Sequence, residues 1–249
     1  MLPIHWISAE DPPDAFPDAR KALREPDGLL AAGGDVGVQR LLAAYPRGIF
    51  PWYEEGQPVL WWSPDPRAVL RPEALHVSRS LRRSLRRSGF VVTWDRAFPE
   101  VVRRCAEPRA GQSGTWITEA MHESFCRLAG LGWAHSVEIW SEDVLVGGIY
   151  GLSIGRVFFG ESMFSRRSDA SKIAMVALAE ELRRREFSLI DCQVVSSHLL
   201  TMGAGTMPRR QFLEVLASNC EPAQRLADLP SGETEAGSLV AARRIANPD

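Results

Sequence analysis

The chain has 249 residues, of which 45% are hydrophobic and 24% charged, a composition typical of a globular protein with an ample core. Its formal net charge of −2 argues against indiscriminate binding of polyanions, and no apolar run reaches the roughly 18 residues of a membrane-spanning helix. The start of the chain lacks the basic and apolar regions of a secretory signal, and the four cysteines show no CxxC spacing. The sequence therefore predicts a cytoplasmic protein without a membrane segment, a zinc site or a redox pair.

Residues 1–66 are rich in proline, glycine and tryptophan, and we expect them to form a small N-terminal domain. Turn-forming residues occupy 25–35, and residues 38–45 have the apolar spacing of a short helix. Aromatic residues then lie on proline-bounded loops, where the simplest interpretation is a small aromatic core. Trp52 is the exception, because a Pro-Trp-Tyr loop beside a basic segment favours stacking on a nucleobase.

The segment from Arg67 to Arg87 holds seven arginines and a single acid, Glu73. Within it, residues 75–88 predict a helix whose leucines face inward. The outer face carries four arginines without interleaved glutamates, so the pattern favours phosphate binding over a merely solvated surface. These predicted phosphate-binding residues are Arg82, Arg83, Arg86 and Arg87.

The next segment predicts a strand, an amphipathic helix, a loop, a second helix and an antiparallel meander of three strands. Trp116 is the one large aromatic of the loop, and Thr118 is a good N-cap for the second helix. The expected ranges are 90–94 and 95–106 for the first strand and helix, 109–117 for the loop, 118–130 for the second helix, and 134–140, 144–150 and 155–159 for the meander.

After the meander we expect a polar loop and then a long helix that begins at Ser168–Asp169, two good N-cap residue types, and ends near Phe187. A strand, a helical turn and a last helix follow, with expected ranges 189–194, 198–202 and 208–217. Residues 67–220 would thus form a second domain. Residues 221–249 are polar and poorly patterned, which predicts a loose tail.

Three polar residues indicate an active site between the loop and the last strand. Glu161 lies in the loop, in a run of small hydroxyl residues on a rigid frame. Period-2 alternation places Asp191 and Gln193 on one face of the strand and Ile190, Cys192 and Val194 on the other. We therefore expect these three side chains to share one neighbourhood.

The order of elements predicts an α+β fold, with a mixed, largely antiparallel sheet and flanking helices. It resembles the second half of the acyltransferase (GNAT-like) fold of the N-acetyltransferases, in which an acyl donor lies where two neighbouring strands splay apart. The Gly-rich turn that would hold a coenzyme A pyrophosphate at a helix N-terminus is missing, because residues 165–172 contain no glycine. This departure weakens the interpretation of the chain as an acetyl-CoA-dependent N-acetyltransferase, which is the main alternative.

Six motifs, in order from about residue 3 to residue 217, closely resemble the leucyl/phenylalanyl-tRNA–protein transferases. They are EPDGLL (25–30), RGIFPWY (47–53), WWSP (61–64), GTWI (114–117), FGESMFS (159–165) and DCQ (191–193). The resemblance implies an aminoacyltransferase that moves Leu or Phe from aminoacyl-tRNA to the α-amine of proteins beginning with Arg or Lys. The products would be marked for proteolysis by the N-degron pathway.

The resemblance also implies roles for individual residues. Asp191 and Gln193 would handle the incoming amine and the reacting carbonyl, and Glu161 would anchor the site. Trp52 and Trp116 would hold the adenosine at the tRNA 3′ end. For three of the remaining candidates, Met175, Leu178 and Leu182, residue spacing alone indicates packing of a helix on the sheet. The resemblance implies that all six remaining candidates line the pocket for the donor side chain. They are Ile149, Phe158, Met175, Leu178, Leu182 and Ile190.

The chemistry of such a transfer agrees with the sequence. An aminoacyl ester is already activated, and the sequence contains no GxxxxGK[ST] motif for ATP, so we expect neither a cofactor nor a metal. The α-amine has a reference pKa of about 7.7–8.0, so its deprotonation at pH 7 costs only about 1 kcal/mol. Whether Asp191 receives the proton or holds the cationic N-terminus stays open. So do two further alternatives, a hydrolase built on Cys192 and His198 and a non-catalytic tRNA-binding module.

Overall fold

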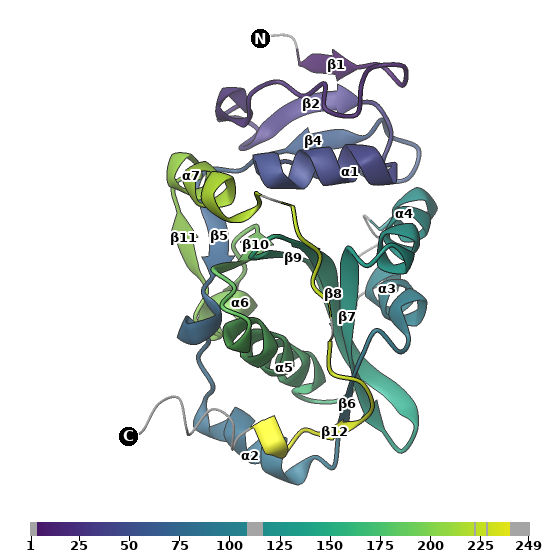
Figure 1. Ribbon diagram of the computed structural model, residues 1–249, viewed down its shortest axis with the longest axis vertical. Coiled ribbons are helices and arrows are strands. Elements are labelled where there is room, and N and C mark those ends of the chain that lie inside the picture. Colours follow the sequence, from purple (N-terminus) through teal and green to yellow (C-terminus); the bar gives the residue numbers. More distant parts are fainter. Residues whose placement is uncertain (1–3, 109–116, 222, 228, 240–249) are drawn as a thin grey trace.

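The N-terminal part of the chain forms a four-stranded sheet covered by one short helix (Figure 1). A computed structural model describes residues 4–108, 117–221, 223–227 and 229–239. The strand order is β1-β2-β4-β3, in which β1 and β2 run parallel and the other pairs antiparallel. The elements are β1 (His5–Ile7), the 3-10 turn η1 (Ala19–Lys21), β2 (Leu29–Gly33), α1 (Val38–Ala44), the 3-10 turn η2 (Tyr45–Arg47), β3 (Phe50–Pro51) and β4 (Leu60–Trp62).

The rest of the chain is built around a larger, eight-stranded sheet with the strand order β11-β5-β10-β9-β8-β7-β6-β12. Its one parallel pair among the described residues is β9 with β10, so the sheet is mixed and largely antiparallel, as predicted. The strands are β5 (Arg67–Leu70), β6 (Val91–Trp94), β7 (Ala134–Ser141), β8 (Val144–Ile154), β9 (Val157–Ser165), β10 (Leu189–Gln193), β11 (Gly205–Met207) and β12 (Thr234–Glu235).

Helices pack on both faces of this sheet (Figure 1). Helices α3, α4 and α7 belong to the apolar core that the large sheet shares with the N-terminal part, and α2 and α5 belong to a second apolar core. The predicted α+β fold class is therefore confirmed. The helices are η3 (Pro72–Ala74), α2 (Arg79–Arg87), α3 (Phe98–Ala106), α4 (Glu119–Gly130), α5 (Ala170–Arg184), α6 (Ser197–Thr201) and α7 (Arg209–Asn219).

Local capping explains where several helices begin. Thr118 accepts a hydrogen bond from the Met121 amide, as expected of an N-cap. Helix α5 begins as predicted, with Asp169 at the N-cap position, but Asp169 has a left-handed backbone (φ 63°) and its side chain makes no cap bond. Its carboxylate instead accepts from Ser84 Oγ at 2.6 Å and from Lys172 Nζ at 3.0 Å, which ties α2 to the start of α5.

Three other predictions are corrected. The polar loop expected after residue 159 is the second half of strand β9, which runs to Ser165 and pairs with β8. The helix expected over 75–88 is confined to α2, since a Ser78 cap starts it only at Arg79. The tail is not loose throughout, because Leu226 and Ala236 are buried in the second core and β12 pairs with β6.

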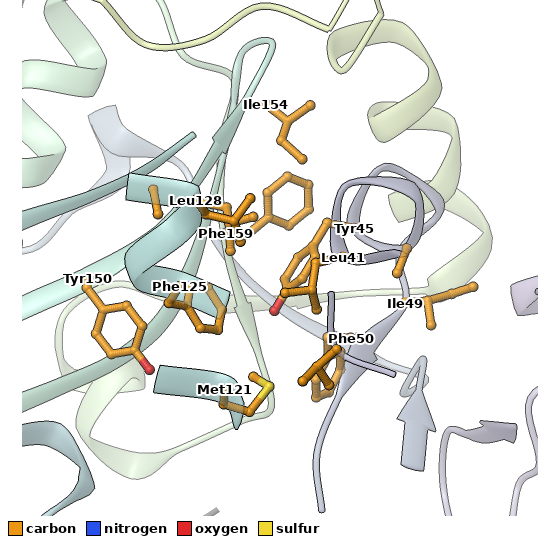
Figure 2. Packing of buried hydrophobic residues seen from close by; sticks show 14 of the residues in the cluster. Leu41, Tyr45, Ile49, Phe50, Met121, Phe125, Leu128, Tyr150, Ile154 and Phe159 are labelled. Carbon is orange, nitrogen blue, oxygen red and sulfur yellow. The ribbon is translucent and has the colours of Figure 1, made fainter. Parts of the chain in front are cut away.

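The N-terminal part and the large sheet share the first core. Figure 2 shows Leu41 and Tyr45 beside Phe159 of β9. The Tyr45 and Phe159 rings meet edge to face at 5.3 Å between centroids, a favourable aromatic geometry. The two parts are therefore packed as one body at the edge where β9 and β10 separate.

Candidate active site

A cavity of about 1000 Å³ opens where strands β9 and β10 separate. The two strands pair in parallel only from Val157 to Phe159 and from Leu189 to Asp191, and beyond these residues they diverge. This is the splay that the acyltransferase-like order of elements predicts. The cavity wall is made of the second half of β9, the end of β10, α6, and the aromatic turn around Trp52.

A β-bulge on each strand turns polar groups towards the cavity. On β9 the pairing with β8 shifts between Gly160 and Ser162, which leaves Glu161 as the extra residue. On β10 the pairing with β5 shifts between Asp191 and Gln193, and Gln193 takes a left-handed backbone with φ 60°. Bulges commonly re-aim side chains beside functional sites. The simple period-2 alternation of the predicted strand therefore does not apply beyond Asp191.

Glu161 and Gln193 meet at the cavity wall. Glu161 Oε1 accepts hydrogen bonds from the Gln193 amide at 2.9 Å and from the Tyr45 hydroxyl at 2.8 Å. Burial raises the pKa of Glu161 to about 8; the Tyr45 hydrogen bond opposes this rise, and the negative charge of Asp191 adds to it. Burial beside Glu161 raises the pKa of Tyr45 well above its ordinary value, so Tyr45 acts as a neutral donor.

Asp191 lies next to this pair but outside the cavity wall. It is fully buried, and Arg67 binds it in a bidentate manner, with Nε–Oδ1 and Nη2–Oδ2 distances of 2.8 and 2.7 Å. Asp191 Oδ1 also accepts the backbone N–H of Gln193 at 2.9 Å. The structure thus brings Glu161, Asp191 and Gln193 into one neighbourhood.

Arg67 is itself held from three sides. Its guanidinium carbon lies 4.7 Å from the Phe50 ring centroid and 4.8 Å from that of Phe212, and its Nη1 donates to the Gly48 carbonyl at 3.2 Å. Sequence reasoning placed Arg67 only in a basic segment and Tyr45 only in a helix. No local signal marks either as a partner of the site, since 124 residues separate Arg67 from Asp191 and 116 separate Tyr45 from Glu161.

The six residues assigned to the donor side-chain pocket do not line this cavity. All are at most 2% exposed and belong to the second apolar core: Ile149, Phe158, Met175, Leu178, Leu182 and Ile190. The cavity wall nearest to that core is formed by Met163, Cys192 and Leu199, which are partly buried and pack against it. Met163 escaped the sequence analysis, although it follows Glu161 by two positions on the same strand.

Trp52 lines the cavity and is 44% exposed. Its carbonyl accepts a hydrogen bond from Trp62 Nε1 at 2.8 Å, and the two rings are 5.8 Å apart. One face of the aromatic turn therefore stays open to a ligand. The second predicted adenosine-binding residue, Trp116, lies outside the described residues.

The predicted phosphate-binding arginines lie together on the exposed side of α2, while Leu81 and Leu85 face the core. Within the described ranges none of the four forms an ion pair. The helix is joined to the start of α5 through Ser84 and Asp169. The basic surface of α2 is thus joined to the start of α5, the helix that follows strand β9 in the chain.

Comparison with known proteins identifies the family. A family model described as leucyl/phenylalanyl-tRNA protein transferase matches residues 69–217, and the model of the N-terminal domain of the same family matches residues 34–65. The chain belongs to this family. A relative of that name from Stutzerimonas stutzeri is 56% identical over 218 residues, 88% of this chain and 96% of the relative. One from Aromatoleum aromaticum is 57% identical over 215 residues, 86% and 90% of the two chains.

Likeness to solved structures is much weaker. A GCN5-related N-acetyltransferase-like protein from Streptococcus suis gives a TM-score of 0.34 at 12% identity, with 64% of this chain and 59% of that chain covered. This value is too low to carry an argument about ligand or activity. Family membership therefore rests on the sequence matches.

The remaining candidate chemistries find little support around the cavity. Cys192 and His198 both line it, but burial raises the pKa of the Cys192 thiol and lowers the pKa of His198, which disfavours a thiolate–imidazolium pair. Among the residues that the structure describes, no cluster of His, Cys, Asp or Glu could hold a metal ion. No described helix is long and apolar enough to cross a membrane.

Proposed function

We propose that this protein transfers Leu or Phe from aminoacyl-tRNA to the α-amine of cytoplasmic proteins that begin with Arg or Lys, and so marks them for N-degron proteolysis. The observation that carries the proposal is the Glu161–Gln193 pair at the wall of a large cavity, in a chain that belongs to the transferase family. In the reaction the acceptor nitrogen attacks the ester carbonyl. The new amide bond replaces the bond to the ribose oxygen of the terminal adenosine.

The cavity offers a place for each part of the donor. The exposed Trp52 face would stack on the terminal adenosine. Met163, Cys192 and Leu199 would meet the Leu or Phe side chain, with the six buried pocket candidates directly behind them. The ester carbonyl would then lie near the Gln193 amide, which can orient it.

The same geometry disfavours acetyl-CoA as the donor. In the acyltransferase fold a pyrophosphate would sit at the start of α5, where the backbone N–H groups attract anions. Here Asp169 occupies that start, and its hydrogen bond from Ser84 lowers the pKa of the carboxyl, so it stays ionised. The Asp169 carboxylate, held by Ser84 and Lys172, thus occupies the helix start that a pyrophosphate would need.

The deciding experiment is transfer of labelled Leu from Leu-tRNA to a peptide that begins with Arg. The matched control is the same peptide beginning with Ala. We expect transfer to the first and little to the second. Absence of transfer to either peptide, with acetylation when acetyl-CoA is added, would establish the alternative instead.

The α2 arginines are expected to bind the tRNA backbone. Changing Arg82, Arg83, Arg86 and Arg87 together to alanine should raise the KM for Leu-tRNA and flatten its salt dependence, by about 0.7–0.9 in the log–log slope for each lost phosphate contact. The comparison is a plot of log KM against log salt for the two proteins. An unchanged slope in the quadruple variant would remove α2 from the tRNA interface.

Trp52 is expected to act on the donor and not on stability. Because Trp52 is exposed on one face, Trp52→Ala should weaken binding of a puromycin-like aminoacyl-adenosine by about 1–3 kcal/mol while the melting temperature changes little. Titration calorimetry and thermal melting measure the two quantities. A large loss of stability with unchanged binding would assign Trp52 to the core.

A further inference from the structure

Two carboxylates lie beside Gln193, and only one of them can serve the reaction as a proton acceptor. We propose that Glu161 takes the proton from the acceptor's α-amine, and that Asp191 with Arg67 forms a buried ion pair that positions Gln193. This assignment rests on the proposed aminoacyl transfer. It reverses the roles that the resemblance implies, in which Asp191 handles the amine and Glu161 only anchors the site.

Asp191 lacks a free lone pair directed at the substrate. Both of its oxygens accept from the Arg67 guanidinium, and Oδ1 also accepts the Gln193 backbone N–H. The residue is 0% exposed and does not line the cavity. Protonation of Asp191 would leave the equally buried Arg67 cation without a counter-ion, which is strongly unfavourable. Its contacts instead hold the Gln193 backbone in the left-handed conformation that turns the amide towards Glu161.

Glu161 has the geometry of an acceptor. The β9 bulge places it at the cavity wall, and Gly151, its neighbour on β8, has no room for a Cβ, which would lie 2.1 Å from the Phe159 carbonyl oxygen. Both described hydrogen bonds to the carboxylate end on Oε1. Among the described residues none donates to Oε2, which leaves this oxygen for the substrate amine.

The charges around Glu161 match its proton affinity to that of the amine. Burial and the negative charge of Asp191 raise its pKa, whereas Tyr45, Gln193 and Arg67 act in the opposite direction, giving a pKa of about 8. The buried Tyr150 hydroxyl on β8 stays neutral as well, since burial and the negative charge of Glu161 raise the pKa of Tyr150. The ammonium form of a reference α-amine has a pKa of about 7.7–8.0, so the neutral amine and the ionised Glu161 carboxylate that the step requires are both populated near pH 8.

The proton balance of the step is simple. The neutral amine nitrogen attacks the ester carbon, and as the C–N bond forms, one N–H proton passes to the Glu161 carboxylate. The bond from carbon to the ribose oxygen then breaks, and this oxygen keeps the electron pair and receives the proton from Glu161. The carboxylate is regenerated, and no cofactor is consumed.

The test is the pH dependence of single-turnover Leu transfer at saturating Leu-tRNA and Arg-initiated peptide. For the wild type we expect the rate to rise with pH through an inflection near 8. Tyr45→Phe removes a hydrogen bond that stabilises the carboxylate, so it should move the inflection upward by about one pH unit. Glu161→Gln should lower the rate on the order of 10²–10⁴-fold and leave only the titration of the amine.

Two further variants separate this role from a structural one. Glu138 is a second buried carboxylate with a raised pKa, held by Thr93 and Ser136 and remote from the cavity wall, so Glu138→Gln should keep the wild-type inflection. Asp191→Asn should lower the rate and move the inflection downward, because it removes the negative charge that raises the pKa of Glu161 and leaves Arg67 uncompensated. An unshifted profile in Tyr45→Phe, or wild-type rates in Glu161→Gln, would overturn the inference while leaving the proposed function intact. A wild type that transfers no Leu would remove both.

Discussion

Replacing Arg67 with methionine is expected to destabilise the protein by about 3–5 kcal/mol and to lower Leu transfer sharply. The reason is the carboxylate left behind, because Asp191 is 0% exposed and the bidentate guanidinium is its only described cation. An uncompensated buried charge costs far more than the net value of the pair. Urea unfolding measures the loss of stability, provided that the dependence of the unfolding free energy on urea concentration (the m value) is the same for both proteins. Single-turnover transfer measures the effect on the site.

Arg67→Lys is the matched control for charge. Lysine keeps the positive charge but lacks the planar fork that reaches both Asp191 oxygens and packs between Phe50 and Phe212. We therefore expect an intermediate loss of stability. The double variant Arg67→Met with Asp191→Asn should lose less than the sum of the two single changes, because neither charge then remains unpaired. Additive losses would show that the pair is not coupled in the folded protein.

The sequence predicted those parts of the fold that depend on local signals. The helix capped by Thr118 and the three-stranded meander follow from capping and from alternation within short segments, and both are confirmed. Each of these signals involves residues a few positions apart. The arrangement of the loop and the strand likewise predicted that Glu161, Asp191 and Gln193 share one neighbourhood.

The rest of the site depends on pairing between distant segments. The β9 bulge exists because Gly160 and Ser162 pair with particular residues of β8, and nothing within the Glu161 segment distinguishes that bulge from a polar loop. Tyr45 belongs to the N-terminal part, and Arg67 begins β5 where that part joins the large sheet. They reach the site only when the two parts pack together. The candidate active site is therefore shared between the two predicted domains, which the sequence boundary near residue 66 does not suggest.

The segment after α7 is expected to contribute more to stability than its polar composition indicates. It crosses the α5 side of the large sheet (Figure 1) and buries Leu226 to 6% exposure in the second core. Its backbone is fixed by hydrogen bonds from Gly155 N–H to the Gln224 carbonyl and from Ala236 N–H to the Phe90 carbonyl. The family model ends at residue 217, so the segment that covers the second core lies beyond the matched region.

Leu226→Ala should accordingly reduce the free energy of unfolding by roughly 2–5 kcal/mol, the usual range for a buried leucine in a packed core. The matched control is Gln224→Ala two residues earlier, where the side chain is exposed and the backbone hydrogen bond is kept, and there we expect a change within about 0.5 kcal/mol. Because Leu226 packs on the core behind the donor-pocket candidates and not on the cavity wall, transfer by the folded fraction should be retained. Equal stability of the two variants would mean that the segment does not cover the core in solution.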